Sequence, residues 1–422
     1  MGKIIPRTAI PIGNRELAAL SDRLLASKDA GEQEVAEFEK KFANYLGVKK
    51  ALAFNSGRTA LYAALQTLKL NPGAEVIVPA YTCAIVFEVV LRLGLKPVLV
   101  DADPKTYNVK PELISKSITS KTKVIIPVHL FGQPCEMDEV IETAKKHGLY
   151  IVEDVAQALG AKYKKVKVGT FGDLAIFSFG PGKSITSGEG GALVVNNTEL
   201  KENVTDFQAK LKMPDLNWNL MLVRNILAMK MFSKQVFYGA VRGHLEESLA
   251  KGDQEIVENC LKLAHKGKRA NLHPTIKLAK MPSVSAAIAR MQLKKLDTIN
   301  RKRRTNAEEL SKLLSDTTDF IQLPRTRDYV ESTFTRYTIR LLKNSREILK
   351  ARLLKQGIDT ERPYNYLPAL FKALHVVAPN AAELAKSTLT LPNHPLVKTP
   401  DIIKIADTLS NELRSQPTEP KP

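Results

Sequence analysis

The sequence predicts an α/β fold organised around a mostly parallel sheet of seven strands. Seven short apolar runs suit buried strands. Helical patterns fill the gaps between most of them, and this alternation favours a parallel sheet with helices on both faces. The strands are expected at residues 50–54, 75–79, 96–101, 123–129, 149–153, 173–179 and 191–196.

The remaining elements divide the chain into a large and a small domain. Helices are expected at residues 15–26, 32–45, 56–70, 135–146 and 281–293. Beyond them, a mixture of helices (296–314, 345–356, 401–414) and strand (335–341) indicates a smaller α+β domain. We therefore expect a large domain over 1–280 with an insertion at about 200–275, a small C-terminal domain over 281–414, and a tail at 415–422 that is disordered by composition.

The composition is that of a globular protein with a basic surface. Three cysteines, Cys83, Cys135 and Cys260, form no disulfide framework, so a reducing, cytoplasmic setting is expected. No apolar run suits a signal peptide or a membrane span. The net charge of +19 suits anionic partners such as nucleotide-sugar phosphates or anionic lipid. Neither nucleic acid nor metal is expected to bind, because the motifs that bind them were not found.

A glycine-rich turn between the last two strands carries a lysine. Five glycines and a proline surround Lys183 between residues 180 and 191, and such turns let the backbone pass close to a ligand. Burial lowers the pKa of a lysine amine and frees the neutral nucleophile, so Lys183 is a candidate for a Schiff base. A solvated loop lysine is the alternative.

The strand at 149–153 delivers Glu153 and Asp154 to its carboxyl end, where open α/β sheets bind ligands. A carboxylate there can pair with the pyridinium nitrogen of pyridoxal phosphate (PLP) and keep the ring protonated. A helix cap is the alternative role for Asp154. The order of Asp154, then Ser178, then Lys183 five residues later favours the cofactor.

A short Ser-Gly turn opens the helix that follows the first strand. A glycine turn entering a helix presents free amides and the positive end of the helix dipole to an anion. Gly57, Arg58 and Thr59 could therefore hold a phosphate, with the Ser178 hydroxyl reaching the same group. An ordinary helix cap is an equally good interpretation of this turn.

Five motifs together resemble the DegT/DnrJ/StrS family of PLP-dependent sugar aminotransferases. They are SGRTAL (56–61), PGAEVIVPAYT (72–82), KVIIPVHLFGQP (123–134), EDVAQALGA (153–161) and SFGPGKSITSGEGG (178–191). The resemblance runs from about Ile10 to about Leu409 and is thinner between Leu200 and Pro282. It implies a fold-type-I transferase that works as a homodimer, and a nucleotide-linked keto-sugar as substrate with glutamate as amino donor.

The resemblance also implies roles for single residues. Lys183 and Asp154 would be catalytic, and the cofactor would further contact Gly57, Arg58, Thr59, Ser178, Cys83 and Gln157. Gln157 would reach the ring hydroxyl. Cys83 stands where relatives often stack an aromatic ring on the cofactor. Sulfur can also pack on a ring face there, Tyr81 is a possible substitute, and either residue could instead belong to the core. Tyr364 and Asn365 would contact the substrate.

Three other functions stay open at this point. A sugar dehydratase of the same family would carry histidine in place of Lys183. A desulfurase would need a mobile cysteine loop late in the chain, and the last cysteine is Cys260. A non-catalytic regulator could keep the fold without the reaction.

Residues 216–245 form an apolar, basic stretch that is helical by composition. It contains Arg224, Lys230, Lys234 and Arg242 and no acidic residue. Such a helix can lie weakly on a membrane surface. Packing against the sheet or a second subunit is the more natural expectation for an enzyme with soluble substrates.

Overall fold

The computed structural model describes residues 3–24, 27–266 and 276–415, and its main sheet has the seven predicted strands. Their order across the sheet is β1-β9-β8-β5-β4-β2-β3, and β9 alone in this sheet runs against its neighbours. The strands are β1 Ala51–Phe54, β2 Glu75–Pro79, β3 Lys96–Val100, β4 Thr122–Ile125, β5 Tyr150–Asp154, β8 Leu174–Ser178 and β9 Gly191–Val195. The predicted mostly parallel α/β fold is therefore confirmed.

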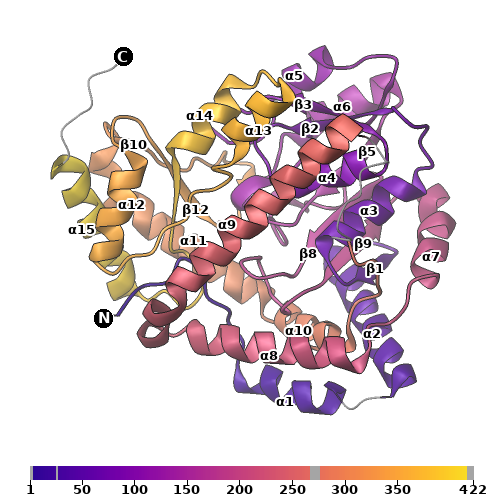
Figure 1. Ribbon diagram of the computed structural model, residues 1–422, viewed down its shortest axis with the longest axis horizontal. Coiled ribbons are helices and arrows are strands. Elements are labelled where there is room, and N and C mark those ends of the chain that lie inside the picture. Colours follow the sequence, from indigo (N-terminus) through magenta and orange to yellow (C-terminus); the bar gives the residue numbers. More distant parts are fainter. Residues whose placement is uncertain (1–2, 25–26, 267–275, 416–422) are drawn as a thin grey trace.

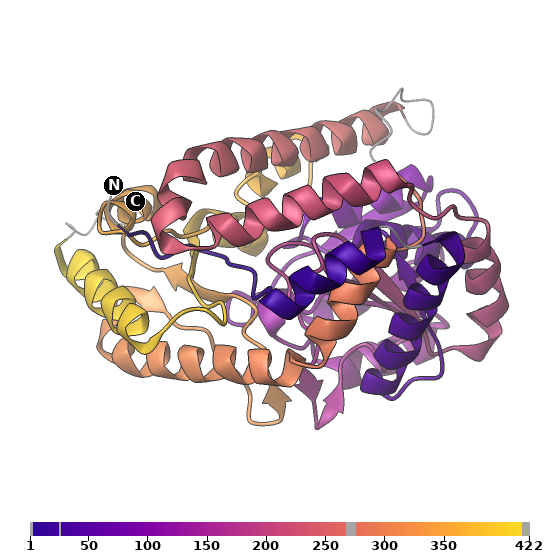
Figure 2. The same ribbon diagram turned by 90° about the horizontal axis from the view of Figure 1, so that it is seen from below.

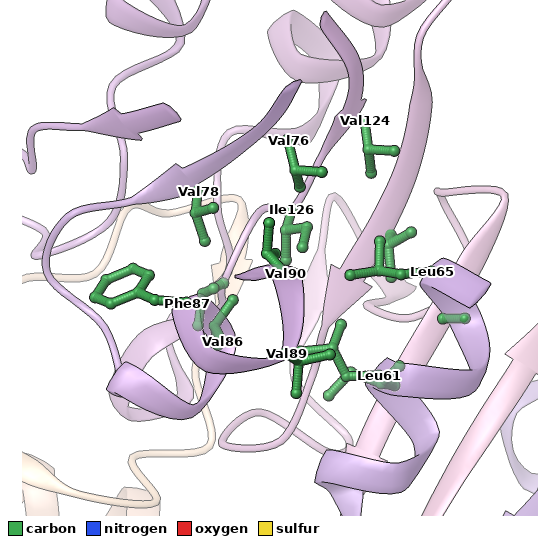
Figure 3. Packing of buried hydrophobic residues seen from close by; sticks show 14 of the residues in the cluster. Leu61, Leu65, Val76, Val78, Val86, Phe87, Val89, Val90, Val124 and Ile126 are labelled. Atoms are coloured by element: carbon green, nitrogen blue, oxygen red, sulfur yellow. The ribbon is translucent and has the colours of Figure 1, made fainter. Parts of the chain in front are cut away.

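Helices cover both faces of this sheet (Figure 1). Alternate strand residues point to opposite faces, so Val76 and Val78 meet α3 and α4 on one side while Ile77 belongs to the core on the other. Figure 3 shows the first side, where Leu61 and Leu65 of α3 pack near Val89 of α4. The helices around the sheet are α1 Asn14–Leu24, α2 Lys28–Leu46, α3 Gly57–Thr67, α4 Ala84–Arg92, α5 Pro111–Lys116, α6 Met137–His147, α7 Lys201–Ala209 and α10 Ser283–Leu293.

The C-terminal part has a three-stranded sheet and its own core. The sheet has the order β10-β12-β13, and its core includes Leu310, Ile339, Leu353 and Leu409. The elements are α11 Leu296–Leu313, β10 Ile321–Gln322, β12 Tyr337–Leu341, α12 Arg346–Lys355, α13 Leu367–Leu374, α14 Pro379–Ser387, β13 Thr388–Leu391 and α15 Thr399–Ser415. A further small sheet joins β11 Val330–Glu331 to the hairpin of β6 Lys162–Tyr163 and β7 Val166–Lys167.

The domain boundaries remain our proposal. Helix α10 packs against α2 in the core of the large sheet, and α11 continues from it into the C-terminal part. We place the connection between the proposed domains along these two helices. Of the tail proposed at 415–422, Ser415 is the last residue of α15 and the rest lies outside the described residues, as do 267–275 of the insertion.

The stretch at 216–245 forms two helices, α8 Leu216–Phe232 and α9 Gln235–Lys266 (Figure 2). Leu222 and Ile226 of α8 pack in a core shared with α1 and α10. The opposite side of α8 leaves Leu216, Leu220, Leu227 and Met231 exposed. No helix within the described residues is both long and apolar enough to cross a membrane.

The charge pattern of this stretch changes once the chain is folded. Arg242 donates from Nε to Asp359 Oδ1 at 2.9 Å and lies 3.4 Å from Glu246 Oε2. Its charge is therefore compensated by acids that lie outside residues 216–245. The sequence shows four cations without an acid, but the structure leaves Arg224, Lys230 and Lys234 as the cations that could face a membrane.

Candidate active site

Lys183 lies in the turn between β8 and β9, and two residues from the C-terminal part hold this turn. Arg303 of α11 donates to the backbone oxygens of Lys183 (3.2 Å) and Ser184 (2.8 Å). The Ser184 hydroxyl lies 3.1 Å from that of Thr335. Arg303 is buried, so these bonds fix the backbone from which the Lys183 side chain projects.

The surroundings of Lys183 favour a neutral amine. Burial lowers the pKa of the Lys183 ammonium, and the nearby charge of Arg336 lowers it further. Asp154 and Cys83 act in the opposite direction. An amine with a lowered pKa is a better nucleophile and proton carrier near neutral pH.

Asp154 ends β5 and is buried. Burial raises the pKa of its carboxyl group, while a hydrogen bond from the Ala156 amide (3.0 Å) and the charges of Lys183 and His129 oppose the increase. A buried carboxylate is costly unless a positive group compensates it. A protonated ring nitrogen beside Asp154 would supply that compensation.

The turn before α3 passes close to Ser178. A Cβ added to Gly57 would lie 2.9 Å from the Ser178 Cβ and 3.2 Å from its Oγ, so glycine is needed for this close approach. A Cβ on Gly191 would lie 2.4 Å from the Gly57 nitrogen, so β9 packs directly on the turn. The first amides of α3 therefore lie next to the Ser178 hydroxyl.

Two other residues of this turn have partners within the protein. Thr59 donates its hydroxyl to Asn55 Oδ1 at 2.7 Å, and its amide donates to the Ser56 hydroxyl at 3.1 Å. Arg58 lies 3.9 Å from Glu88 Oε2. The Ser56 hydroxyl thus caps α3 and the Thr59 hydroxyl is bound to Asn55, and the proposed phosphate contacts of Thr59 and Arg58 stay predictions.

Gln157 and Tyr364 meet on the C-terminal side of the site. The Gln157 amide donates from Nε2 to the Tyr364 hydroxyl at 2.8 Å. Tyr364 has a φ of 53°, in the left-handed region that is uncommon for a tyrosine. Its ring lies edge-on to Tyr81 at 5.2 Å. The structure therefore brings one proposed cofactor residue and one proposed substrate residue into direct contact.

The remaining predicted residues lie in different environments. Cys83 caps α4 and is half-buried, close enough to Lys183 to influence the pKa of its amine. Tyr81 is fully buried and shares a hydrogen bond of 2.7 Å with Thr388, so it belongs to the core. Asn365 is exposed, and its proposed substrate contact stays a prediction.

Three residues of the site escaped the sequence analysis. Arg303 holds the Lys183 turn, and Arg336 lowers the pKa of the Lys183 amine while it pairs with Glu361 at 2.8 Å. Tyr366 accepts a hydrogen bond from the Ala84 amide at 3.0 Å, next to Cys83. None of the three lies in one of the five motifs, so they can be identified only from their positions in the folded chain.

The arrangement fits PLP. Lys183 could hold the aldehyde carbon, Asp154 the ring nitrogen, and Gly57 with Ser178 the phosphate. Two features favour this cofactor: the glycine that the close approach to Ser178 requires, and the buried Asp154 carboxyl group, which forms no ion pair within the described residues.

Comparison with known proteins gives the same family as the motifs. The profile of the DegT/DnrJ/EryC1/StrS aminotransferase family matches residues 12–217 and 249–410. GDP-perosamine synthase of Caulobacter vibrioides is 48% identical over 166 residues, which are 39% of this chain and 45% of that protein. This match covers less than half of the relative's length.

Two further relatives match along most of their length. The dTDP-3-amino-3,4,6-trideoxy-alpha-D-glucose transaminase of Streptomyces venezuelae is 30% identical over 417 residues, 96% of this chain and 95% of that protein. The pleiotropic regulatory protein of Geobacillus stearothermophilus is 32% identical over 372 residues, 86% of this chain and 85% of that protein.

Solved structures share the fold over nearly the whole chain. DesV of S. venezuelae has a TM-score of 0.72 at 28% identity and covers 96% of this chain and 95% of its own. An aminotransferase of Psychrobacter cryohalolentis has a TM-score of 0.77 at 26% identity, with 97% and 99% covered. Enzymes of the matched family depend on PLP, and a structural neighbour from Streptococcus pneumoniae is solved in its PLP form. The chain belongs to the DegT/DnrJ/EryC1/StrS aminotransferase family.

Proposed function

We propose that the protein is a PLP-dependent aminotransferase that converts a nucleotide-linked keto-sugar to an amino-sugar, with glutamate as the donor. The observation that carries the proposal is the placement of Asp154 at the end of β5 and of Lys183 in the turn after β8, its parallel neighbour, where each group influences the pKa of the other. The names of the relatives support a sugar substrate.

The protein's own residues have separate tasks in this reaction. Bound PLP supplies an electron sink for the bond that breaks at the donor carbon. The Lys183 amine, with its lowered pKa, accepts the proton from that carbon and later donates it to complete the transfer. Asp154 would hold a positive charge on the ring nitrogen, and Gln157, which donates to Tyr364, would contact the ring hydroxyl.

Absorbance of the purified holoenzyme tests the proposal. We expect a visible band from the lysine-bound cofactor and its loss on adding glutamate, followed by its return on adding a keto-sugar nucleotide. A regulator that keeps the fold without the reaction would show no loss of the band with any amino donor. A dehydratase would convert the sugar without consuming the donor.

We propose a homodimer as the working form. The proposal is supported by the family resemblance, in which the active site lies between two subunits. Analytical ultracentrifugation at the concentration of the activity assay measures the state directly. A monomer that turns over at the full rate would refute the dimer.

We propose a cytoplasmic location with a weak contact to anionic lipid through the exposed side of α8. The stripe of Leu216, Leu220, Leu227 and Met231 lies beside cations. An anionic surface complements those cations. The free thiols of the three cysteines suit a reducing compartment.

Vesicle co-sedimentation tests the lipid contact. Each cation near such a surface contributes roughly 1 kcal/mol, so Arg224, Lys230 and Lys234 should give binding at low salt that high salt abolishes. We expect the intact chain to pellet with anionic vesicles and the triple glutamine variant to stay in solution. Pelleting with neutral vesicles, or no pelleting with anionic vesicles at low salt, would contradict the proposed lipid contact.

A further inference from the structure

Arg336 follows the residue that contacts the Lys183 turn. The Thr335 hydroxyl lies 3.1 Å from that of Ser184, so this contact joins the two segments of the backbone that carry Arg336 and Lys183. The positive charge of Arg336 lowers the pKa of the Lys183 amine, which agrees with this placement. Arg336 therefore belongs to the site from the side of the Lys183 turn.

Hydrogen bonds also join Arg336 to the opposite side of the site. Its backbone amide donates to the Phe131 oxygen at 3.4 Å, and the Phe131 amide donates to Gln157 Oε1 at 3.2 Å. Gln157 in turn donates to Tyr364 at 2.8 Å. The rings of Phe131 and Tyr364 stack with their centroids 6.2 Å apart, and both residues have a φ in the left-handed region, 56° and 53°. Such strained backbone is concentrated at functional sites.

The guanidinium group of Arg336 has one partner and further donors. Nη1 donates to Glu361 Oε1 at 2.8 Å, and the other N–H groups of this side chain form no hydrogen bond with the residues that the structure describes. The two side chains are 24% and 32% exposed, so a small anion can reach both. Because a guanidinium carries five N–H donors and binds carboxylates with two parallel bonds, Arg336 can accept a carboxylate from outside the protein.

We propose that Arg336 is a specificity-determining residue that binds the α-carboxylate of the amino donor, and that Glu361 competes with this carboxylate. The α-carboxylate is bonded to the carbon from which Lys183 is proposed to take the proton, so the cation that binds it must lie beside Lys183. The phosphates of a nucleotide-sugar are separated from the reacting carbonyl by the sugar ring and need no cation there. The inference rests on the proposed aminotransferase function.

The competition with Glu361 distinguishes a binding role from a structural one. If the ion pair only supported the fold, loss of either partner would leave the other uncompensated, and both changes would harm the site. If Arg336 binds the donor, loss of the Glu361 charge removes a competitor and frees the guanidinium. The two single changes then have opposite effects on the affinity for the donor.

The experiment compares wild type with Arg336→Gln, Arg336→Lys and Glu361→Gln, all as holoenzymes. Arg340→Gln is the matched control, since Arg340 lies about 13 Å further along β12 and 3.9 Å from Glu383. One probe is α-methylglutamate, in which a methyl group replaces the hydrogen on the reacting carbon, so that it binds without proton transfer. The other is γ-aminobutyrate, which lacks the α-carboxylate. Calorimetry gives the dissociation constants of both amines and of free GDP and dTDP.

We expect Arg336→Gln to weaken the binding of α-methylglutamate by about 10- to 100-fold, because hydrogen bonds between two charged groups are lost. Arg336→Lys should restore part of the affinity, since it keeps the charge without the planar fork. Glu361→Gln should strengthen the binding by about threefold or more. The affinities for γ-aminobutyrate and the free nucleotides should stay unchanged in these variants, and every affinity should stay unchanged in Arg340→Gln.

The inference fails if wild type does not prefer α-methylglutamate to γ-aminobutyrate, or if Arg336→Gln and Glu361→Gln weaken binding alike. It also fails if Arg336→Gln weakens the nucleotides instead, which would assign the guanidinium to a phosphate. Melting temperatures show whether each variant folds, and if Arg336→Gln does not, the gain or loss of affinity in Glu361→Gln decides. If glutamate causes no loss of the visible band in wild type, the proposed function fails, while the dissociation constants of α-methylglutamate still decide the role of Arg336.

Discussion

Replacing Lys183 by alanine is expected to lower the rate of the glutamate half-reaction by roughly 10²–10⁴-fold, the range found when a proton-transfer group is lost. The amine is the proposed proton carrier, and its surroundings lower its pKa so that it is available in the neutral form. Cofactor should still bind without a covalent bond, because Gly57, Ser178 and Asp154 remain. Single-turnover absorbance measures the rate, and calorimetry measures retention of PLP.

Two controls separate the role of Lys183 from a general loss of structure. Small primary amines added to Lys183→Ala should restore part of the rate, since they can enter the space left by the side chain. Borohydride reduction of the wild type followed by peptide mapping should mark Lys183. A label on another lysine, or a variant with near-normal rates, would show that Lys183 does not carry the cofactor.

The sheet could be predicted because its signals are local. Each strand of the main sheet is a short apolar run, and the glycines between β8 and β9 mark a turn regardless of what surrounds it. The end of β4 was predicted at His129, whereas the strand ends at Ile125. After Ile125 the apolar residues 126–128 still lie buried, and Val128 still forms an isolated parallel bridge with Asp154. The hydrophobic pattern therefore predicts burial and some pairing there, but not the point at which the regular strand is interrupted.

Contacts between distant residues could not be predicted in the same way. Arg303 and Lys183 are 120 residues apart, and Arg242 and Asp359 are 117 apart. No local pattern in the sequence distinguishes Arg303 from the other basic residues of α11. The apolar, basic composition of 216–245 suggested packing or a weaker membrane contact, but it could not indicate that Tyr238 and Arg242 bind the buried Asp359. Such ion pairs are set by the tertiary fold alone.

Asp154→Asn is expected to leave cofactor bound and to slow the glutamate half-reaction by about a hundredfold. An amide keeps the shape of the carboxylate and can still accept from the Ala156 amide. It cannot stabilise a positive charge on the ring nitrogen, and a hydrogen bond to a charged group contributes about 1.5–3 kcal/mol. Stopped-flow absorbance measures the rate, and unchanged PLP content shows that binding is intact.

Glu153→Gln is the matched control, because adjacent strand residues point to opposite faces. Glu153 is buried and accepts hydrogen bonds from the amides of Gly169 (2.7 Å), Phe171 (2.8 Å) and Gly172 (2.7 Å). A glutamine would turn an amide group toward these donors, which should cost about 1–3 kcal/mol of folding stability. We expect Glu153→Gln to lower the melting temperature, while the fraction that stays native reacts with glutamate at a near-normal rate. We expect Asp154→Asn to keep its melting temperature and to react slowly. Near-normal rates in Asp154→Asn, or the same loss of stability in both variants, would mean that Asp154 supports the strand rather than the reaction.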